Sequence, residues 1–149
     1  MELQIRKASK EDIKGLCRLM EQLNGRPLLP EEMERRLDFI DRNPSEELYV
    51  CTETTKGDQT AILGALGFRI RENLQNMSRY GEVSLLVTDR RVRRRGIGKG
   101  LMDFAERLAT ERNCIGTWLA SGMGRVNEAH VFYKSLGYEI TGYRFVKTR

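Results

Sequence analysis

The spacing of apolar positions predicts a strand and two helices in the first third of the chain. Leu3 and Ile5 alternate with polar neighbours, which is typical of a short strand. Apolar residues then recur every three or four positions from the Ser9 cap to residue 24, and again over residues 30–43. We therefore expect one strand followed by two helices.

The apolar period changes to two in the middle of the chain. Residues 48–51 and 61–70 are predicted to form a hairpin with its turn near residues 56–58. Residues 82–88, which read EVSLLVT, predict a third strand of the same meander. Three consecutive strands joined by short turns favour antiparallel pairing.

Helical spacing returns over residues 98–113. A strand is then predicted at residues 117–120, a helix at residues 127–136, and a final strand or hairpin at residues 138–146. This order predicts a mixed α/β fold, a mostly antiparallel central sheet flanked by helices in which strands 82–88 and 117–120 form a parallel pair. Because no repeat or linker interrupts it, we expect residues 1–149 to form a single domain.

Composition places the chain among globular proteins, since hydrophobic residues make up 40% and charged residues 32% of its 149 residues. No apolar run approaches the roughly 20 residues that cross a bilayer, so we expect a cytoplasmic protein without a membrane partner. Cys17, Cys51 and Cys114 are scattered, which favours reduced thiols. With His130 as the one histidine, we expect no metal site.

Positive charge is concentrated in one segment, RRVRRRGIGKG at residues 90–100. The net charge of the chain is +5, and residues 90–99 alone carry six positive charges and no negative one. Glycines between a strand and a helix let the backbone approach an anion, and the first amides of the helix have no partner within it. The helix dipole adds partial positive charge there, so the segment favours a pyrophosphate.

The spacing and composition of this segment argue against three other kinds of anion site. A Walker loop needs a hydroxyl residue after the lysine, but Gly100 follows Lys99. A dinucleotide-binding fingerprint needs G-x-G-x-x-G, whereas residues 96–100 read G-x-G-x-G. Nucleic-acid binding is disfavoured because no aromatic residue interleaves with the arginines. An alternative in which the glycines only shape a turn stays open.

Two segments resemble the GNAT superfamily of acyl-CoA-dependent N-acetyltransferases. Arg93-x-x-Gly96-x-Gly98, between the strand EVSLLVTD and the helix KGLMDFAERLA, resembles its Q/R-x-x-G-x-G/A motif. The segment NEAHVFYKSLGY at residues 127–138 resembles its N-x-A-x-x-F-Y-x-x-x-G-F/Y pattern. The resemblance covers nearly the whole chain, and it departs at Arg90 and Arg94, where many members have proline and glycine.

The resemblance implies how acetyl-CoA is held. Its pantetheine arm is expected beside strand 82–88, near Leu86 and Thr88, where the parallel strands splay apart and the Leu86 amide would polarise the thioester carbonyl. Asn127 is implied to hold the pantetheine or phosphate portion, or to cap its helix. The pyrophosphate would lie on the backbone of the turn, which here comprises Arg93, Arg94, Arg95, Gly96, Ile97, Gly98, Lys99 and Gly100.

The resemblance also implies the catalytic groups and the reaction. Glu82 matches a position where some members place a general base, although it could equally be an ordinary strand-end carboxylate. Tyr133 matches the tyrosine that protonates the leaving thiolate in many members. Because neither Cys51 nor Cys114 lies at a suitable turn with a partner histidine, we expect direct transfer to the acceptor without an acyl-enzyme.

The acceptor is expected to be a primary amine of a small molecule. The loop and helix start at residues 24–32 and the closing residues 142–147 resemble aminoalkylphosphonate and aminoglycoside acetyltransferases. Two alternatives remain: acetylation of a protein amino terminus or lysine, and a non-catalytic acyl-CoA-binding module. A homodimer is also possible in this superfamily.

Overall fold

The computed structural model describes residues 2–54, 60–93, 95–121 and 126–149. The predicted hairpin turn near residues 56–58 lies outside them. In chain order the elements, in which η denotes a short 3-10 or π-helical turn, are β1 (Glu2–Lys7), η1 (Lys10–Asp12), α1 (Ile13–Asn24), α2 (Pro30–Arg42), β2 (Glu46–Thr54), β3 (Thr60–Asn73), β4 (Ser78–Thr88), η2 (Arg90–Val92), α3 (Ile97–Glu111), β5 (Gly116–Leu119), η4 (Val126–His130) and α4 (Val131–Ser135).

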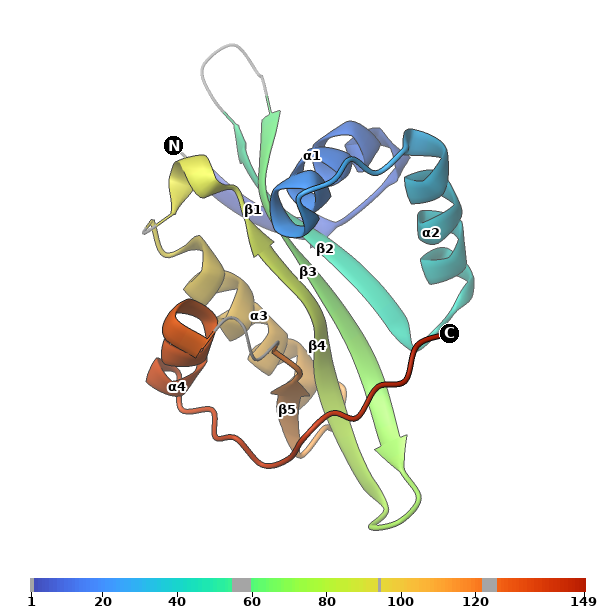
Figure 1. Ribbon diagram of the computed structural model, residues 1–149, viewed down its shortest axis with the longest axis vertical. Coiled ribbons are helices and arrows are strands. Elements are labelled where there is room, and N and C mark those ends of the chain that lie inside the picture. The colour runs from blue at the N-terminus through green and yellow to red at the C-terminus, as the bar shows by residue number, and fades with distance from the viewer. Residues whose placement is uncertain (1, 55–59, 94, 122–125) are drawn as a thin grey trace.

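The strands form one sheet in the order β1-β2-β3-β4-β5 (Figure 1). The first four strands pair antiparallel, and β5 pairs parallel to β4 after the crossover through α3. This confirms the predicted mixed and mostly antiparallel sheet, because the short connections of the meander permit antiparallel pairing and the long crossover permits a parallel strand.

Helices cover both faces of the sheet, and each face has its own apolar cluster. One cluster joins α3 to the sheet through Leu101, Met102 and Ala105, which pack with Leu66 and Phe68. The second joins α1 and α2 to the opposite face. Neighbouring strand residues alternate between the clusters, as the period of two requires. The second cluster contains Leu16, Leu19, Met33, Leu37, Val50, Ile62, Ala65 and Val87.

The parallel pair is short. β4 pairs with β5 from Tyr80 opposite Gly116 to Val83 opposite Leu119, whereas β4 continues to Thr88. On its other side β4 stays paired with β3 along its whole length. The last five residues of β4 therefore extend beyond β5, which is the divergence that the resemblance implied.

The prediction of a strand or hairpin at residues 138–146 is wrong. No strand or helix is assigned there, and Tyr143 and Phe145 are 82% and 93% exposed. Figure 1 shows this segment running from α4 across the sheet towards the end of α2. A strand needs the backbone of a neighbour, and the four-residue β5 pairs with β4 but with no C-terminal strand among the described residues.

The predicted helix at residues 127–136 forms at nearly the expected position but is less regular. It consists of the π-helical turn η4 followed by the five-residue α4. Within the described residues, no helix has both the length and the apolar composition that crossing a bilayer requires.

Candidate active site

The β4–α3 turn comprises residues 89–100, of which residue 94 lies outside the described residues. Gly96 caps α3 in the left-handed conformation, with φ of 77°, which a residue without a β-carbon adopts readily. The first bond of the helix is donated by the Gly100 amide to the Gly96 carbonyl at 2.9 Å. The amides of Ile97, Gly98 and Lys99 precede it and point out of the helix end, as an anion requires.

The start of α3 is anchored in the core and lies close to α4. Ile97 is buried in the cluster beneath α3. A β-carbon placed on Gly98 would lie 3.5 Å from Cζ of Phe132 and 3.8 Å from Cγ2 of Thr88. The structure therefore brings together the end of β4, the beginning of α3 and α4, which carry most of the predicted site residues.

Tyr133 lies on α4 in a group of aromatic rings. Its ring packs edge-on against Phe132, with centroids 5.2 Å apart, and against Tyr138 at 6.2 Å. The Tyr138 hydroxyl lies 2.7 Å from the Thr117 hydroxyl and donates to Glu106 at 3.0 Å. Burial, together with Glu106, raises the pKa of Tyr138 to about 12. Tyr138 was not predicted as a site residue, although it closes the segment that resembles the superfamily.

Leu86 and Thr88 lie on the part of β4 that extends beyond β5. Both are half-buried, and Leu86 packs against the cluster beneath α3. Asn127 lies in η4, and its side chain is outside the described part of the chain. Arg94 is likewise outside the described residues.

Glu82 is buried in a polar ladder that crosses three strands. It faces Arg69 of β3, and Arg69 faces Glu46 of β2. Arg71 donates from Nε to Glu82 at 2.7 Å, while Arg69 lies 3.7 Å from the other carboxylate oxygen. On the β5 side Glu82 is opposite Trp118, one pair before the parallel pairing ends. The predicted base thus lies next to the point where β4 and β5 stop pairing, and its carboxylate interacts with the guanidinium groups of Arg69 and Arg71.

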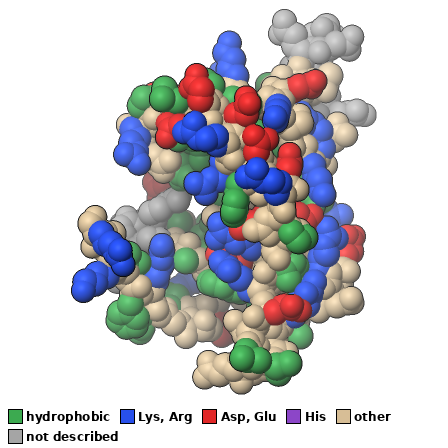
Figure 2. All heavy atoms as spheres, turned by 90° about the vertical axis from the view of Figure 1, so that its right-hand side faces the viewer, with side chains coloured by type: hydrophobic (Ala, Val, Ile, Leu, Met, Phe, Trp, Pro, Cys, Tyr) green, Lys and Arg blue, Asp and Glu red, His purple; other side chains and the backbone are tan. Residues whose placement is uncertain are grey.

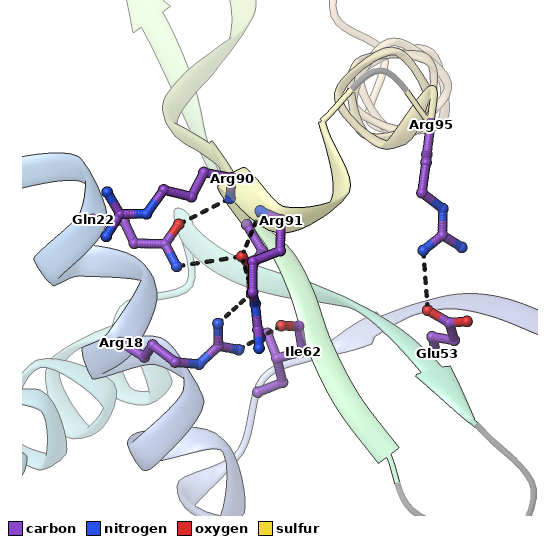
Figure 3. Close-up of polar contacts among 8 residues, drawn as sticks. Arg18, Gln22, Glu53, Ile62, Arg90, Arg91 and Arg95 are labelled. Carbon is purple, nitrogen blue, oxygen red and sulfur yellow. Dashed lines mark hydrogen bonds and ion pairs between the residues drawn. The ribbon is translucent and has the colours of Figure 1, made fainter.

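The arginines of the turn differ in what they contact. Arg91 binds Asp89 at 2.8 Å, and Arg95 lies 3.4 Å from the buried Glu53 of β2 (Figure 3). Arg93 is exposed. Outside this set, Lys99 pairs with Asp103 one helical turn away at 3.1 Å. At least two of the arginines therefore hold carboxylates of this chain and are not directed only at a ligand.

Asp89 was missed in the sequence. It is fully buried at the start of the turn and accepts hydrogen bonds from Arg91, Arg18 and Gln22. These bonds, with Arg91 first, outweigh burial and hold the pKa of Asp89 well below its ordinary range. Its partners on α1 are about 70 positions earlier in the chain, so spacing could not reveal them. The signal that was available is an acidic residue directly between an apolar strand and an arginine run.

Charges are mixed on the side of the molecule that carries α2. Figure 2 shows Lys and Arg side chains interspersed with Asp and Glu there. A surface of this kind lacks the single-sign stripe that the backbone of a nucleic acid attracts. No cluster of three or more His, Cys, Asp or Glu side chains suited to a metal occurs in the described part of the chain.

Solved structures with the same fold include several acetyltransferases. A transcriptional regulator from Bacillus halodurans C-125 is 24% identical over 99% of each chain, with a TM-score of 0.83. Glucosamine-6-phosphate N-acetyltransferase from Arabidopsis thaliana is 24% identical over 99% of each chain, with a TM-score of 0.79. An aminoglycoside N-acetyltransferase in complex with CoA is 16% identical, covering 99% of this chain and 95% of its own, with a TM-score of 0.80.

At these identities the likeness to solved structures establishes the fold alone. No curated protein sequence matches the chain. The family model of the acetyltransferase (GNAT) family, in contrast, matches residues 13–138, which include every described element from α1 to α4. The chain therefore belongs to the GNAT family and is an acetyl-CoA-dependent acyltransferase.

Proposed function

We propose that this protein transfers the acetyl group of acetyl-CoA directly to a primary amine of a small molecule. The observation that carries the proposal is that β4 runs on beyond β5 and leads into the left-handed Gly96 and the N-terminus of α3. An extended pantetheine arm and its pyrophosphate need these two features in this order. The apolar clusters on both faces of one sheet support treating residues 1–149 as a single domain.

The residues present fit coenzyme A. Backbone groups of Leu86 and Thr88 on the diverging part of β4 would bind the arm as an added strand does. The amides of Ile97, Gly98 and Lys99 would bind the pyrophosphate, and the remaining predicted turn residues would shape that site. Thr88 and Phe132 lie close enough to Gly98 to narrow the space available there. Asn127 is proposed to contact the pantetheine or phosphate portion.

Glu82 is proposed to accept the proton of the acceptor amine, directly or through water. An alkyl amine with a pKa of about 10.4 is a free base in only about one molecule in a thousand at neutral pH, so a base accelerates its attack. Arg71 occupies one carboxylate oxygen at 2.7 Å, so the amine or a bridging water would donate to the other oxygen, which lies 3.7 Å from Arg69.

Tyr133 is proposed to protonate the leaving thiolate. The thioester supplies the electrophilic carbonyl: the amine nitrogen forms the new bond to it, the carbon–sulfur bond breaks, and the sulfur leaves with the electron pair. The Leu86 amide would stabilise the charge on the carbonyl oxygen. The aromatic neighbours Phe132 and Tyr138 restrict the orientation of the Tyr133 ring, which supports a fixed proton donor.

A small-molecule acceptor is favoured by two of the similar structures. One is a glucosamine-6-phosphate N-acetyltransferase and the other is an aminoglycoside N-acetyltransferase, and both acceptors are small amines. The segment between α1 and α2 is proposed to contribute to the acceptor site, as it does in the members that this chain resembles. Acetylation of a protein amine and non-catalytic binding of acyl-CoA are the competing functions, and a homodimer is retained as a proposal.

The test is release of free thiol from acetyl-CoA with a panel of amines. The panel comprises a hexosamine phosphate, an aminoglycoside, an aminoalkylphosphonate and peptides with a free amino terminus or lysine. Turnover of a small amine is expected. Turnover of peptides alone would favour the protein-acetylating alternative, and coenzyme A binding without any turnover would favour the non-catalytic one.

Tyr133→Phe separates the proposed acid from packing. The loss of a proton donor should lower kcat by about a hundredfold while coenzyme A affinity is retained. Tyr80→Phe is the matched control, because Tyr80 lies on β4 at the end away from the turn. An unchanged kcat in Tyr133→Phe would remove this residue as the acid without affecting the assignment of the reaction.

A further inference from the structure

Asp89 is a buried carboxylate at the junction between β4 and the β4–α3 turn. None of its surface is exposed. A charge in this position is stable only when its partners replace the water that it has lost. The residue also lies next to a site proposed for an anion, where a negative charge by itself would weaken binding. Its presence there needs an explanation other than attraction of the ligand.

The partners of Asp89 come from two parts of the chain. From the turn, the Arg91 amide donates to Oδ1 at 3.0 Å and the Arg91 guanidinium donates to Oδ2 at 2.8 Å. From α1, Arg18 donates to Oδ2 and Gln22 donates to Oδ1 at 3.3 Å (Figure 3). Both oxygens therefore bind the turn and α1 at the same time.

Gln22 adds a second link between the same elements. Its Oε1 accepts a hydrogen bond from the Arg90 amide at 3.0 Å, while its amide group donates to Asp89. Arg18 also donates to the Ile62 carbonyl of β3 at 2.9 Å, which fixes the guanidinium against the sheet. The polar groups thus close a network that connects α1, β3 and the backbone of η2.

Apolar packing does not replace this network. An open hollow lies between α1 and η2, lined by Arg18, Glu21, Gln22, Gly25, Arg90 and Arg91. None of these residues belongs to either apolar cluster. On the sheet side η2 is held separately, because Val92 packs against the cluster beneath α3 and the Asp89 amide donates to the Leu63 carbonyl at 2.7 Å. The hydrogen bonds of Asp89 and Gln22 supply its link to α1.

We infer that Asp89 is a positioning residue that sets the backbone of the β4–α3 turn for coenzyme A by fixing it to α1. The inference rests on the proposed binding of coenzyme A at this turn. Asp89 acts through Arg91 and Gln22 and does not touch the ligand. Its effect is on where the amides of Ile97, Gly98 and Lys99 lie when the pyrophosphate arrives.

If Asp89 acted only through its charge, Asp89→Asn would change coenzyme A affinity in the opposite direction. Asp89 cancels one of the positive charges of Arg18 and Arg91. If the arginines acted only by attracting phosphate, Asp89→Asn would raise the local positive charge and strengthen binding of coenzyme A. If Asp89 positions the turn, the same variant leaves two guanidinium groups without their carboxylate and weakens binding.

The experiment measures coenzyme A binding to purified wild type and Asp89→Asn by calorimetry, with hydrogen exchange as a second readout. The variant should bind about tenfold more weakly, since a buried charged partner has been removed. In the wild type, coenzyme A should slow amide exchange in both the turn and α1. The slowing in α1 should be lost in the variant, whereas kcat at saturating acetyl-CoA should change less than affinity.

Asp12→Asn is the matched control for lost stability. Asp12 is also buried, binds Arg6 at 2.8 and 2.9 Å and accepts from the Ser9 amide at 2.8 Å, but it lies at the opposite end of α1. Its substitution should destabilise the fold and leave coenzyme A affinity unchanged. Should Asp89→Asn fail to fold, Gln22→Leu provides the test instead. It removes the hydrogen bonds of Gln22 to Asp89 and to the Arg90 amide, and coenzyme A affinity should fall about threefold.

The outcomes are distinguishable from those of the proposed function. Wild-type protein that does not bind coenzyme A would overturn both proposals. Wild-type protein that binds, together with Asp89→Asn and Gln22→Leu of equal or higher affinity, would overturn the positioning role and leave the proposed function intact. An equal loss of affinity in Asp12→Asn would also overturn it, since the effect would then follow general stability.

Discussion

The two halves of β4 have the same neighbour on one side and different surroundings on the other. Up to Val83 the strand lies between β3 and β5, and its Glu82 is engaged in a ladder of ion pairs. Beyond Val83 it pairs with β3 but not with β5, and it ends at Thr88, directly before the buried Asp89. One half is closed by protein and the other leaves backbone groups for a ligand.

This difference shows how a sheet can offer a binding edge in its interior. Unpaired backbone groups in a sheet invite another chain to add to them. Besides the outer edges of β1 and β5, the last five residues of β4 have no partner on the β5 side, and α3 and α4 approach that end through Gly98 and Phe132. The short β5 therefore leaves a short binding edge next to α3 and α4.

The largest loss of coenzyme A affinity is expected from a substitution of Gly96, which lies between the end of β4 that β5 leaves unpaired and the start of α3. Gly96→Val places a β-branched side chain at φ of 77°, which forces the backbone at the start of α3 to move. The amides at this helix end would then be displaced from the pyrophosphate, and we expect coenzyme A affinity, measured by calorimetry, to fall about a hundredfold, which corresponds to about 2.7 kcal/mol.

Asn113→Val is the control for backbone strain. Asn113 has φ of 61° and lies just beyond the other end of α3, which stops at Glu111. Both variants place a β-branched side chain at positive φ and should lower the free energy of unfolding. If Asn113→Val weakened coenzyme A binding as much as Gly96→Val, the Gly96 effect would reflect strain in general and not the helix terminus.

In the half of β4 that pairs with both β3 and β5, Glu82→Gln tests the proposed general base. Loss of a general base should lower kcat about tenfold at neutral pH, a modest factor because water can take the proton from part of the amine. The defect should shrink as the pH rises towards the pKa of the acceptor amine, since the free base then forms without help. Steady-state rates across this range provide the measurement.

Glu46→Gln changes the other end of the same ladder. Glu46 accepts from Arg69 Nε at 2.6 Å and lies two strands away from the parallel pair. It should lower stability without lowering kcat. Equal kcat values for Glu82→Gln and wild type would leave Glu82 as a structural carboxylate.

A smaller effect concerns stability in acid. The folded state holds the pKa of Asp89 below its ordinary value, so the stabilisation is present above the unfolded pKa of about 3.9 and is lost as the pH falls towards the folded pKa. Between pH 6 and pH 3 the difference in unfolding free energy between wild type and Asp89→Asn should narrow by about 1 kcal/mol. Urea denaturation at both pH values measures it, and a constant difference would contradict the shift.

The smallest effect on coenzyme A affinity is expected from a substitution of Arg93, whose side chain is exposed in the β4–α3 turn. Arg93→Gln should weaken coenzyme A binding about threefold at low salt, as exposed charge interactions are weak. The difference should disappear at high salt because the charges are screened. Arg35→Gln on α2, also exposed, should change nothing at either ionic strength. A salt-independent loss in Arg93→Gln would indicate a fixed hydrogen bond instead.

Local patterns predicted the parts of this fold that local forces determine. The meander, the helix after the glycines and the parallel crossover follow from apolar spacing and connection length, and each lies where it was expected. The predicted strand at residues 138–146 had the same kind of pattern, with Tyr143 and Phe145 alternating, yet no strand forms there. A period of two shows which residues could form a strand, but pairing requires a neighbouring backbone.

The candidate site was predictable where its residues are contiguous. The turn glycines and Tyr133 were found from short segments, and the structure brings their elements together. The partners of Glu82 and Asp89 were not found, because ion pairs between strands and between α1 and η2 depend on tertiary packing. Short sequence segments therefore pointed to the groups proposed to face the ligand and missed the residues that hold their elements in place.

The link between Arg18 and Asp89 joins residues 71 positions apart. The meander of β2, β3 and β4 closes through short connections, whereas this bond requires α1 to be packed before the turn acquires its final backbone. Contacts of high sequence separation cost more loop-closure entropy and form late in folding. The β4–α3 turn should accordingly be among the last parts of the chain to fold, and coenzyme A, which is proposed to bind only the completed turn, should slow unfolding without accelerating folding.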